Sequence, residues 1–524
     1  MTHTNHASGH SKAVPLAIFA ILAAYVVALA LGLPQLGTRR IVEEAAHHGA
    51  AGNEAADAAE HAEEATPVAP PLPTVIPFIL LLAAIAILPL IPATSHWWES
   101  NLNRFLVAMG LALVAVAYYA FLHKTALEGH WPAHHVVEPG DGWPRIHFVR
   151  TILENAILKE FIPFIVLLFS LFTISGGIRI TGDLQAHPMT NATFMGVGGL
   201  LASFIGTTGA AMLLIRPVLE TNRERKHVVH TVVFFIFIVC NCGGCLLPIG
   251  DPPLFLGYLE GVDFLWTLRL WPEWLFVNGL LLVIYLLVDE LWYYRREKLA
   301  DIRRDVERQH RLRIGGWKIN VPLLMGVVLA VGLLDPSKRL PGTDWHPWMY
   351  LREVVQLGLV AISLWWGDRH VRAANKFNYH AIIEVAALFS GIFITMQPAL
   401  QILGVYGDQL GVRTPAQFFW ATGGLSSALD NAPTYLVFFK TAQAMPLPPG
   451  ATAMAGVEEH ILVGISLGAV FMGAMTYIGN GPNFMVRAIA ESSGVRMPSF
   501  FGYMVYSCVF LLPLLVLTVW YYLM

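Results

Sequence analysis

Apolar residues in this chain form runs long enough to cross a bilayer, and short polar segments separate them. A helix of about 20 apolar residues spans the hydrocarbon core of a membrane. The runs therefore predict eleven membrane-spanning helices, and we expect an all-α polytopic membrane protein. The predicted spans are 13–33, 74–94, 103–123, 152–178, 228–258, 271–293, 319–335, 350–366, 379–403, 459–490 and 499–522.

The run at 13–33 also has the apolar character of a signal peptide. It is long for that role, and no small-residue cleavage site follows it directly. We therefore interpret it as a retained first helix.

Two further apolar stretches, 193–217 and 416–440, are interrupted near their middles by Gly, Thr or Asp-Asn-Ala-Pro. An ordinary lipid-facing span does not tolerate such breaks, because the freed backbone groups have no water to bind. Each stretch is therefore predicted to enter and leave the membrane on the same face, as a re-entrant hairpin.

The charge of the loops orients the chain, since Lys and Arg collect on the cytoplasmic side. The segments 218–228, 292–318 and 367–378 are basic, whereas 441–458 has no basic residue up to Glu458. The stretch 41–70 is acidic, Ala-rich and His-bearing, which predicts a mobile external loop. These signs place the N-terminus in the cytoplasm and the C-terminus outside, with hairpin 193–217 entering from inside and hairpin 416–440 from outside.

The interrupted places recur in the same order in both halves. Phe169-Ser170 aligns with Phe389-Ser390, Gly198-Gly199-Leu200 with Gly423-Gly424-Leu425, and the Ile-Gly-Asp-Pro-Pro at 249–253 with Ile-Gly-Asn-Gly-Pro at 478–482. Five spans and one hairpin make each copy, so the second copy runs through the membrane inverted. Inverted repeats with broken helices are typical of secondary transporters. Simple Gly/Pro kinks in a packed bundle are the alternative, and they explain four symmetric sites poorly.

The repeats divide the chain into four parts. We expect an N-terminal helix and acidic external loop at 1–73, a first repeat at 74–293, a basic cytoplasmic linker at 294–318 and a second repeat at 319–524.

Composition agrees with a membrane protein and excludes several functions. Apolar residues make up 56% and charged residues 13%, with a mean hydropathy of +0.57, which no water-soluble surface allows. The net charge of −3 argues against a nucleic-acid partner. No Walker motif, Rossmann glycine pattern or nucleophile constellation is recognisable, so neither an enzyme nor ATP-driven transport is expected. We expect no cofactor, only Na⁺ and H⁺ as transported or coupling ions.

Oxygen-bearing residues gather at the two hairpin tips and at the two helix breaks. Hydroxyls, amide oxygens and freed carbonyls form the hard-oxygen surroundings that suit Na⁺. For Na⁺ itself the predicted ligands are Thr207, Asp430 and Asn431. The full set predicted to bind the ion or substrate is Ser203, Gly206, Thr207, Thr208, Gly250, Ser427, Asn431, Thr434, Gly479, Asn480 and Asn483.

Three acidic residues in apolar segments are candidate proton carriers: Asp430, Asp251 and Glu384. An ionised carboxylate in the membrane is costly unless it meets a cation or a proton. The alternatives are a helix cap for Asp430, a turn before two prolines for Asp251, and a snorkelling interfacial side chain for Glu384.

Two further groups contain possible metal ligands: the cysteines 240, 242 and 245, and the histidines of 41–70. Close packing beside a Gly-rich break explains the cysteines better, and solvated loop residues explain the histidines better.

Four motifs resemble the ion transporter superfamily, in its arsenite-pump and sodium–proton antiporter branch, and within it the putative citrate-transport family. They are IGTTGAAMLLIRP (205–217), PIGDPPLFLGYLEGV (248–262), SSALDNAPT (426–434) and YIGNGPNFMVRAIAE (477–491). The resemblance covers about 74–522 and implies scaffold and transport regions, hairpins that meet near a central site, an elevator-like motion and a homodimer. Dicarboxylate carriers of the superfamily have Ser-Asn-Thr at the hairpin tips. This chain has Gly-Thr-Thr and Asp-Asn-Ala-Pro-Thr there, which argues against a dicarboxylate role.

Our sequence-based hypothesis is a Na⁺/H⁺ antiporter of a bacterial-type inner membrane, with the bilayer and inorganic cations as its partners. The alternative is a Na⁺- or H⁺-coupled carrier for citrate or another organic or inorganic anion, because half-helix N-termini also bind carboxylates. A membrane receptor or structural protein would leave the broken helices without a role.

Overall fold

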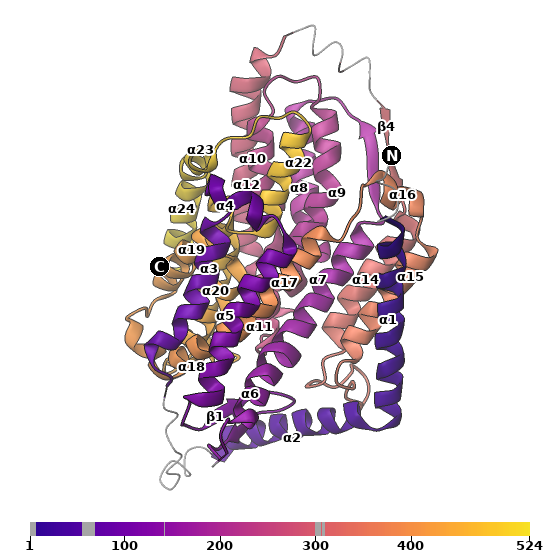
Figure 1. The fold of residues 1–524 in the computed structure, drawn as a ribbon. Helices are drawn as coiled ribbons and strands as arrows, with labels where there is room; N and C mark the ends of the chain where they lie inside the picture. Colours follow the sequence, from indigo (N-terminus) through magenta and orange to yellow (C-terminus); the bar gives the residue numbers. More distant parts are fainter. Residues whose placement is uncertain (1–6, 55–68, 141, 299–304, 306–309) are drawn as a thin grey trace.

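The computed structural model describes residues 7–54, 69–140, 142–298, 305 and 310–524 (Figure 1). Four helices in these residues are long and apolar enough to cross a membrane: Asn101–Phe121, Ile146–Ser175, Trp266–Arg296 and Phe500–Tyr522. The count rises to seven if each of three bent helix pairs is one span. The chain is therefore a largely helical, polytopic membrane protein, and the count of eleven spans stays a prediction.

The first half of the chain forms helices on both sides of several sharp breaks. A π-helical stretch at Glu154–Phe161 joins α6 to α7, so these three form one continuous span. The helices are α1 (Ala7–Ala30), α2 (Leu33–Glu54), α3 (Ile76–Ile87), α4 (Pro92–Trp98), α5 (Asn101–Phe121), α6 (Ile146–Leu153), α7 (Ile162–Ser175), α8 (Pro188–Ile205), α9 (Thr207–Thr221), α10 (Val229–Val239), α11 (Pro252–Leu259) and α12 (Trp271–Val288).

The second half has a similar succession of short helices. Its helices are α14 (Trp317–Leu333), α15 (Leu351–Trp366), α16 (Arg369–Ala374), α17 (His380–Thr395), α18 (Gln397–Tyr406), α19 (Pro415–Ala428), α20 (Asn431–Gln443), α21 (Glu459–Met472), α22 (Gly481–Ser492), α23 (Phe500–Tyr506) and α24 (Leu512–Tyr522).

Both stretches that were predicted to be hairpins fold as helix pairs with a tight connection. Helices α8 and α9 meet at Gly206, and α19 and α20 meet at Leu429 and Asp430. In Figure 1, α8 and α9 lie toward the upper end of the molecule, whereas α19 and α20 lie lower down. The predicted spans 228–258 and 459–490 are each divided in two, which gives α10 and α11 in one and α21 and α22 in the other.

The core of the molecule is built around these divided helices. All residues of α10 from His230 to Val239 are buried. A helix that is apolar on every side is stable only when other helices surround it. α10 packs against α8 and α22, and α21 packs against α19 and α20.

The acidic stretch near the N-terminus differs from the prediction. Its residues 41–54 belong to α2, not to a loop, and residues 55–68 lie outside the described part of the chain. Ala and Glu are strong helix formers, so this composition also suits a helix. The chain bends by 70° between α1 and α2, and α2 then runs along the lower end of the molecule in Figure 1.

The described residues also form three small antiparallel sheets that the sequence analysis did not predict. β1 (Leu127–Gly129) pairs with β2 (His135–Val137), and β5 (Ala453–Met454) pairs with β6 (Val457–Glu458). β3 (Arg179–Asp183) pairs with β4 (His310–Gly315), with Arg179 opposite Gly315. Residues 310–315 of the linker predicted at 294–318 are therefore fixed against the first repeat.

Candidate functional site

Both hairpin tips and both helix breaks converge on one carboxylate, that of Asp251. Thr207 Oγ1 donates to Asp251 Oδ1 at 3.0 Å from the first hairpin, and Asn431 Nδ2 donates to Oδ2 at 2.7 Å from the second. Asn480 Nδ2, in the break before α22, donates to Oδ1 at 3.0 Å. Asp251 is only 1% exposed, so neutral donors stabilise a carboxylate that is almost completely removed from solvent.

Glycines allow the backbone of the first hairpin tip and that of the first helix break to come close to each other. Gly206 has a φ of +78° at the turn between α8 and α9, a conformation that side chains disfavour. A Cβ on Gly250 would lie 2.2 Å from the carbonyl oxygen of Gly244. Pro252 follows at the first turn of α11, where a missing N–H costs nothing. The local sequence thus presents Asp251 at the start of a half-helix.

The second break has corresponding contacts. A Cβ on Gly479 would lie 2.6 Å from the carbonyl oxygen of Gly473. Ser203 Oγ in the first hairpin donates to the carbonyl of Gly243 at 2.7 Å, and Ser426 Oγ in the second donates to that of Ala469 at 2.7 Å. The buried Ser203 therefore connects the first hairpin to the segment of the first helix break by a hydrogen bond and does not face an open cavity.

A chain of amide contacts beside this cluster fixes the orientation of Asn241, a residue that the sequence analysis did not select. Asn483 Nδ2 donates to the carbonyls of Gly473 at 2.9 Å and Thr476 at 3.0 Å, so its Oδ1 is left to accept. Asn241 Nδ2 donates to that oxygen at 2.8 Å and to the carbonyl of Ile236 at 2.9 Å. The buried Oδ1 of Asn241 then has no hydrogen-bond partner in the described part of the chain.

The amide oxygen of Asn431 also lacks a hydrogen-bond partner. The Nδ2 of Asn431 donates to Asp251, and its buried Oδ1 has no partner among the described residues. Both residues border the space beside Gly473. A Cβ there would lie 3.1 Å from Asn241 Oδ1, 3.3 Å from the carbonyl of Gly479 and 3.6 Å from Asn431 Nδ2. Buried acceptors without a donor cost about 1–3 kcal/mol, and a cation removes that cost. The Oδ1 atoms of Asn241 and Asn431 are therefore candidate ligands for Na⁺, and Asn431 is hydrogen-bonded through Nδ2 to the carboxylate of Asp251.

Asp430 has a different environment. Its Oδ1 accepts from the backbone N–H of Ala432 at 3.1 Å, which is the N-cap contact of α20. Nearby, Thr434 Oγ1 donates to the carbonyl of Asp430 at 2.9 Å, and Ser427 Oγ donates to that of Gly424 at 2.7 Å. Of the predicted Na⁺ ligands, the structure brings Thr207 and Asn431 to Asp251.

The other candidates lie outside this cluster. Glu384 in α17 pairs with Arg104 of α5 at 2.8 Å. The cysteines 240, 242 and 245 are buried free thiols in and beside the first break. The carbonyl of Cys240 accepts from Asn480 Nδ2 at 3.0 Å, so this segment contributes backbone to the cluster.

A cavity of about 70 Å³ borders the first hairpin tip. The tip and the first break form one wall, through Gly206, Thr208 and Gly250, while α7 and α17 form the other, through Phe172 and Ile382 among others. Thr208 is therefore placed at the junction between the hairpin and the helices outside it.

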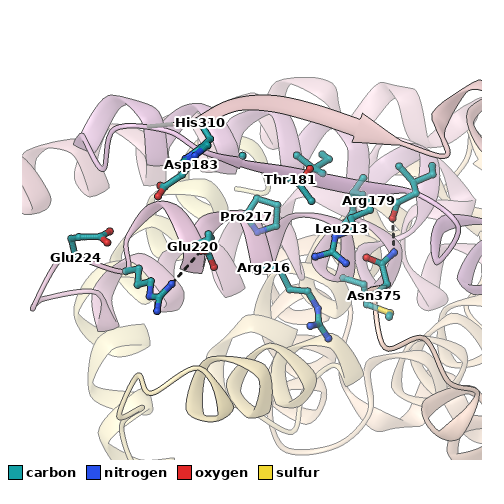
Figure 2. A pocket seen from close by; sticks show the side chains of 15 residues that line it. Arg179, Thr181, Asp183, Leu213, Arg216, Pro217, Glu220, Glu224, His310 and Asn375 are labelled. Carbon is teal, nitrogen blue, oxygen red and sulfur yellow. Dashed lines mark hydrogen bonds and ion pairs between the residues drawn. The ribbon is translucent and has the colours of Figure 1, made fainter. Parts of the chain in front are cut away.

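A larger cavity of about 550 Å³ lies between β3 and α9 (Figure 2). One end has Asp183, Glu220 and Glu224 together with His310 and with Arg223, which pairs with Glu220, and the other end has Arg179 and Arg216. Among the described residues, the side chains of Arg179 and Arg216 have neither an ion pair nor a hydrogen bond. An anion entering this cavity would meet two available guanidinium groups.

A family model described as "Putative citrate transport" matches residues 145–523, which is most of the chain and includes all the residues around Asp251. No curated protein matches the chain significantly. The matched region holds both hairpins, both breaks and the cavities beside them, and on this match the chain belongs to that citrate-transport family.

Proposed function

We propose that the protein is a secondary active transporter that exchanges Na⁺ for H⁺ at a site centred on Asp251. The observation that carries this proposal is the convergence of Thr207, Asn431 and Asn480, from both hairpins and the opposite break, on one buried carboxylate.

The chemistry follows from the cost of burying charge. An ionised carboxylate away from water costs several kcal/mol unless a cation or proton compensates it. Na⁺ bound by the free oxygens of Asn241 and Asn431 would compensate the charge of Asp251, and a proton would do so when Na⁺ leaves. Competition of the two ions for one carboxylate is enough to couple their fluxes, provided that the empty, charged form crosses slowly.

The placement of the site also supports alternating access. Asp251 binds side chains of both hairpins, so movement of the hairpins relative to α7 and α17 would carry the whole cluster. The corresponding contacts of Ser203 and Ser426, and of Gly250 and Gly479, support two inverted repeats.

Inside-out vesicles with a respiratory proton gradient test this function. We expect added NaCl to dissipate the gradient in vesicles that contain the wild type, and potassium gluconate at equal ionic strength to leave it unchanged. Vesicles without the protein are the control. A gradient that is insensitive to Na⁺ and Li⁺ over pH 6.5–8.5 would refute the antiporter.

A second candidate is an ion-coupled carrier for citrate or a related anion. It is favoured by the family description and by the guanidinium groups of Arg179 and Arg216, which have no partner among the described side chains. Uptake of radiolabelled citrate by proteoliposomes separates the two functions. The carrier predicts uptake that Arg216→Gln lowers, whereas the antiporter predicts no citrate uptake and normal exchange by Arg216→Gln.

A further inference from the structure

A cluster of possible metal ligands lies at the end of the molecule opposite the β3–β4 sheet, far along the chain from the residues around Asp251. Glu128 of β1 faces two histidines of the loop that follows, and His130 Nε2 and His134 Nε2 lie 3.8 Å and 3.9 Å from its Oε2. The three ligand atoms all lie within 4.8 Å of one another. Both distances to the carboxylate are too long for hydrogen bonds.

These separations are close to those that a bound metal requires. Tetrahedral Zn²⁺ with bonds of about 2.0–2.1 Å places its ligand atoms about 3.3 Å apart. Each histidine–carboxylate pair therefore needs to close by only about half an ångström, and the two histidine nitrogens, which lie within 4.8 Å of each other, by no more than about 1.5 Å. Rotation of the side chains on a fixed backbone can supply such movements.

The backbone of the first two ligands is held by a buried residue. Asn155, only 2% exposed, donates through Nδ2 to the carbonyl of Glu128 at 2.9 Å. Its Oδ1 accepts from the N–H of His130 at 2.7 Å. One amide thus fixes both ligands relative to each other, as residues behind metal ligands commonly do.

The third ligand is fixed by the N-terminal region. The N–H of His134 donates to Glu44 Oε2 of α2 at 2.9 Å. Between the two histidines, Trp131 Nε1 donates to Tyr350 Oη at 2.9 Å, which anchors the loop to the rest of the protein. The loop is therefore preorganised by contacts with three separate segments.

We propose that Glu128, His130 and His134 form a binding site for Zn²⁺ or a similar divalent transition metal, with water at the fourth position. Two imidazoles and one carboxylate are a common zinc ligand set, whereas Ca²⁺ and Mg²⁺ prefer oxygen alone. The bound metal would connect the two ends of the β1–β2 loop to each other. It would also link the loop to α2, because the N–H of His134 donates to Glu44. This site is independent of the proposed exchange at Asp251.

Zinc titration of the purified full-length chain, without an affinity tag, tests the site. We compare the wild type with His134→Ala, Glu128→Gln and the control His135→Ala, which removes the exposed neighbouring histidine of β2. The chain has further histidines, but they are the same in all four proteins, so only differences between the proteins are interpreted.

Isothermal titration with ZnCl₂ is expected to show one fewer tight equivalent for His134→Ala and Glu128→Gln than for the wild type and His135→Ala. Zn²⁺ should also raise the Tm of the wild type and of His135→Ala more than that of the two ligand variants. The same stoichiometry in the wild type and His134→Ala, or the same loss in His135→Ala, would overturn the proposal.

Discussion

Asp251 and Asp430 lie at the N-termini of α11 and α20, but their carboxylates have different partners. Asp251 accepts from three side chains of other segments, whereas Asp430 accepts from a backbone N–H of its own helix. Of the three candidate proton carriers in the sequence, only Asp430, which interrupts an apolar hairpin, was also a predicted Na⁺ ligand. The contacts favour Asp251 for the exchange and a cap for Asp430, and this distinction stays a prediction.

Asp430→Asn tests the distinction. Asn caps helices about as well as Asp, so we expect the free energy of unfolding to change by less than about 0.5 kcal/mol. Na⁺-driven dissipation of the proton gradient should persist in vesicles at no less than about half the wild-type rate. The reason is that a side chain that only caps a helix does not bind the exchanged ions. Loss of that activity at normal expression would show that the carboxylate of Asp430 takes part in the exchange.

Gly250 offers a second test at the residue scale. A Cβ there would meet backbone atoms on two sides, Gly244 O at 2.2 Å and Ser203 Cα at 2.9 Å, and neither can move alone. We expect Gly250→Ala to destabilise the protein by about 1–3 kcal/mol, as overpacking does. Thermal unfolding in detergent should show a lower Tm.

Gly279→Ala in α12 is the matched control, since no atom lies within 4 Å of its added Cβ. In a helix this change is neutral or stabilises by up to about 1 kcal/mol. Equal Tm values for the two variants would contradict the close approach of the first break to the hairpin.

At the scale of elements, much of the site was predictable because membrane physics makes broken helices conspicuous. Polar and Gly-rich interruptions in apolar runs predicted both hairpins, at 193–217 and 416–440, and the structure has helix pairs with a turn there. Which side chains meet was not predictable. The role of Asn241 depends on how Asn483 is oriented by two carbonyls, and that is a tertiary contact.

Other elements left no usable pattern in the sequence. β3 and β4 are short and more than a hundred residues apart, so neither alternation nor a turn signal connects them. The proposed zinc ligands are close in the chain, but only the fold of the β1–β2 loop brings their side chains together. α2 was missed because an acidic, Ala-rich composition suits both a solvated loop and a helix.

The junction between α5 and α6 should be sensitive to pH through His123. This histidine is 2% exposed and packs against Tyr119 and Phe148, with ring centroids 5.2 Å and 5.1 Å away. Burial lowers the pKa of His123 from 6.5 to about 4. As the pH falls below 6.5, the unfolded chain takes up a proton that the folded chain does not. This group therefore destabilises the fold more and more down to about pH 4, and below that pH the effect stays constant.

His123→Phe keeps the aromatic packing and removes the titration. We expect the Tm of the variant, relative to that of the wild type, to rise as the pH is lowered from 7.5 to 5. Thermal unfolding in detergent at several pH values measures this difference. A difference in Tm that is constant over this range would show that His123 takes up a proton in the folded protein as easily as in the unfolded one.

At the scale of the whole molecule, the matched family and the apolar helices establish a membrane protein of the citrate-transport family. The inverted orientation of the repeats, the inner-membrane location and the homodimer stay predictions. The orientation predicts that β4, within the basic linker, is cytoplasmic, whereas the loop after α20 is outside.

Cysteine labelling in intact cells measures this orientation. Only Cys508 of the native cysteines is exposed, so Cys508→Ser gives an unreactive background. Leu312→Cys and Pro449→Cys each replace an exposed residue. An impermeant maleimide should label Pro449→Cys in intact cells and Leu312→Cys only after permeabilisation. Labelling of both from the same side would contradict the inverted repeats.

The central claim is that Na⁺ and H⁺ compete for the carboxylate of Asp251. The most direct measurement is the proton release that follows the addition of NaCl to purified protein in weakly buffered detergent solution. At a pH where the carboxylate is partly protonated, we expect the wild type to release protons with a saturable dependence on Na⁺, and Asp251→Asn to release none. Equal release by Asp251→Asn and the wild type would contradict this account.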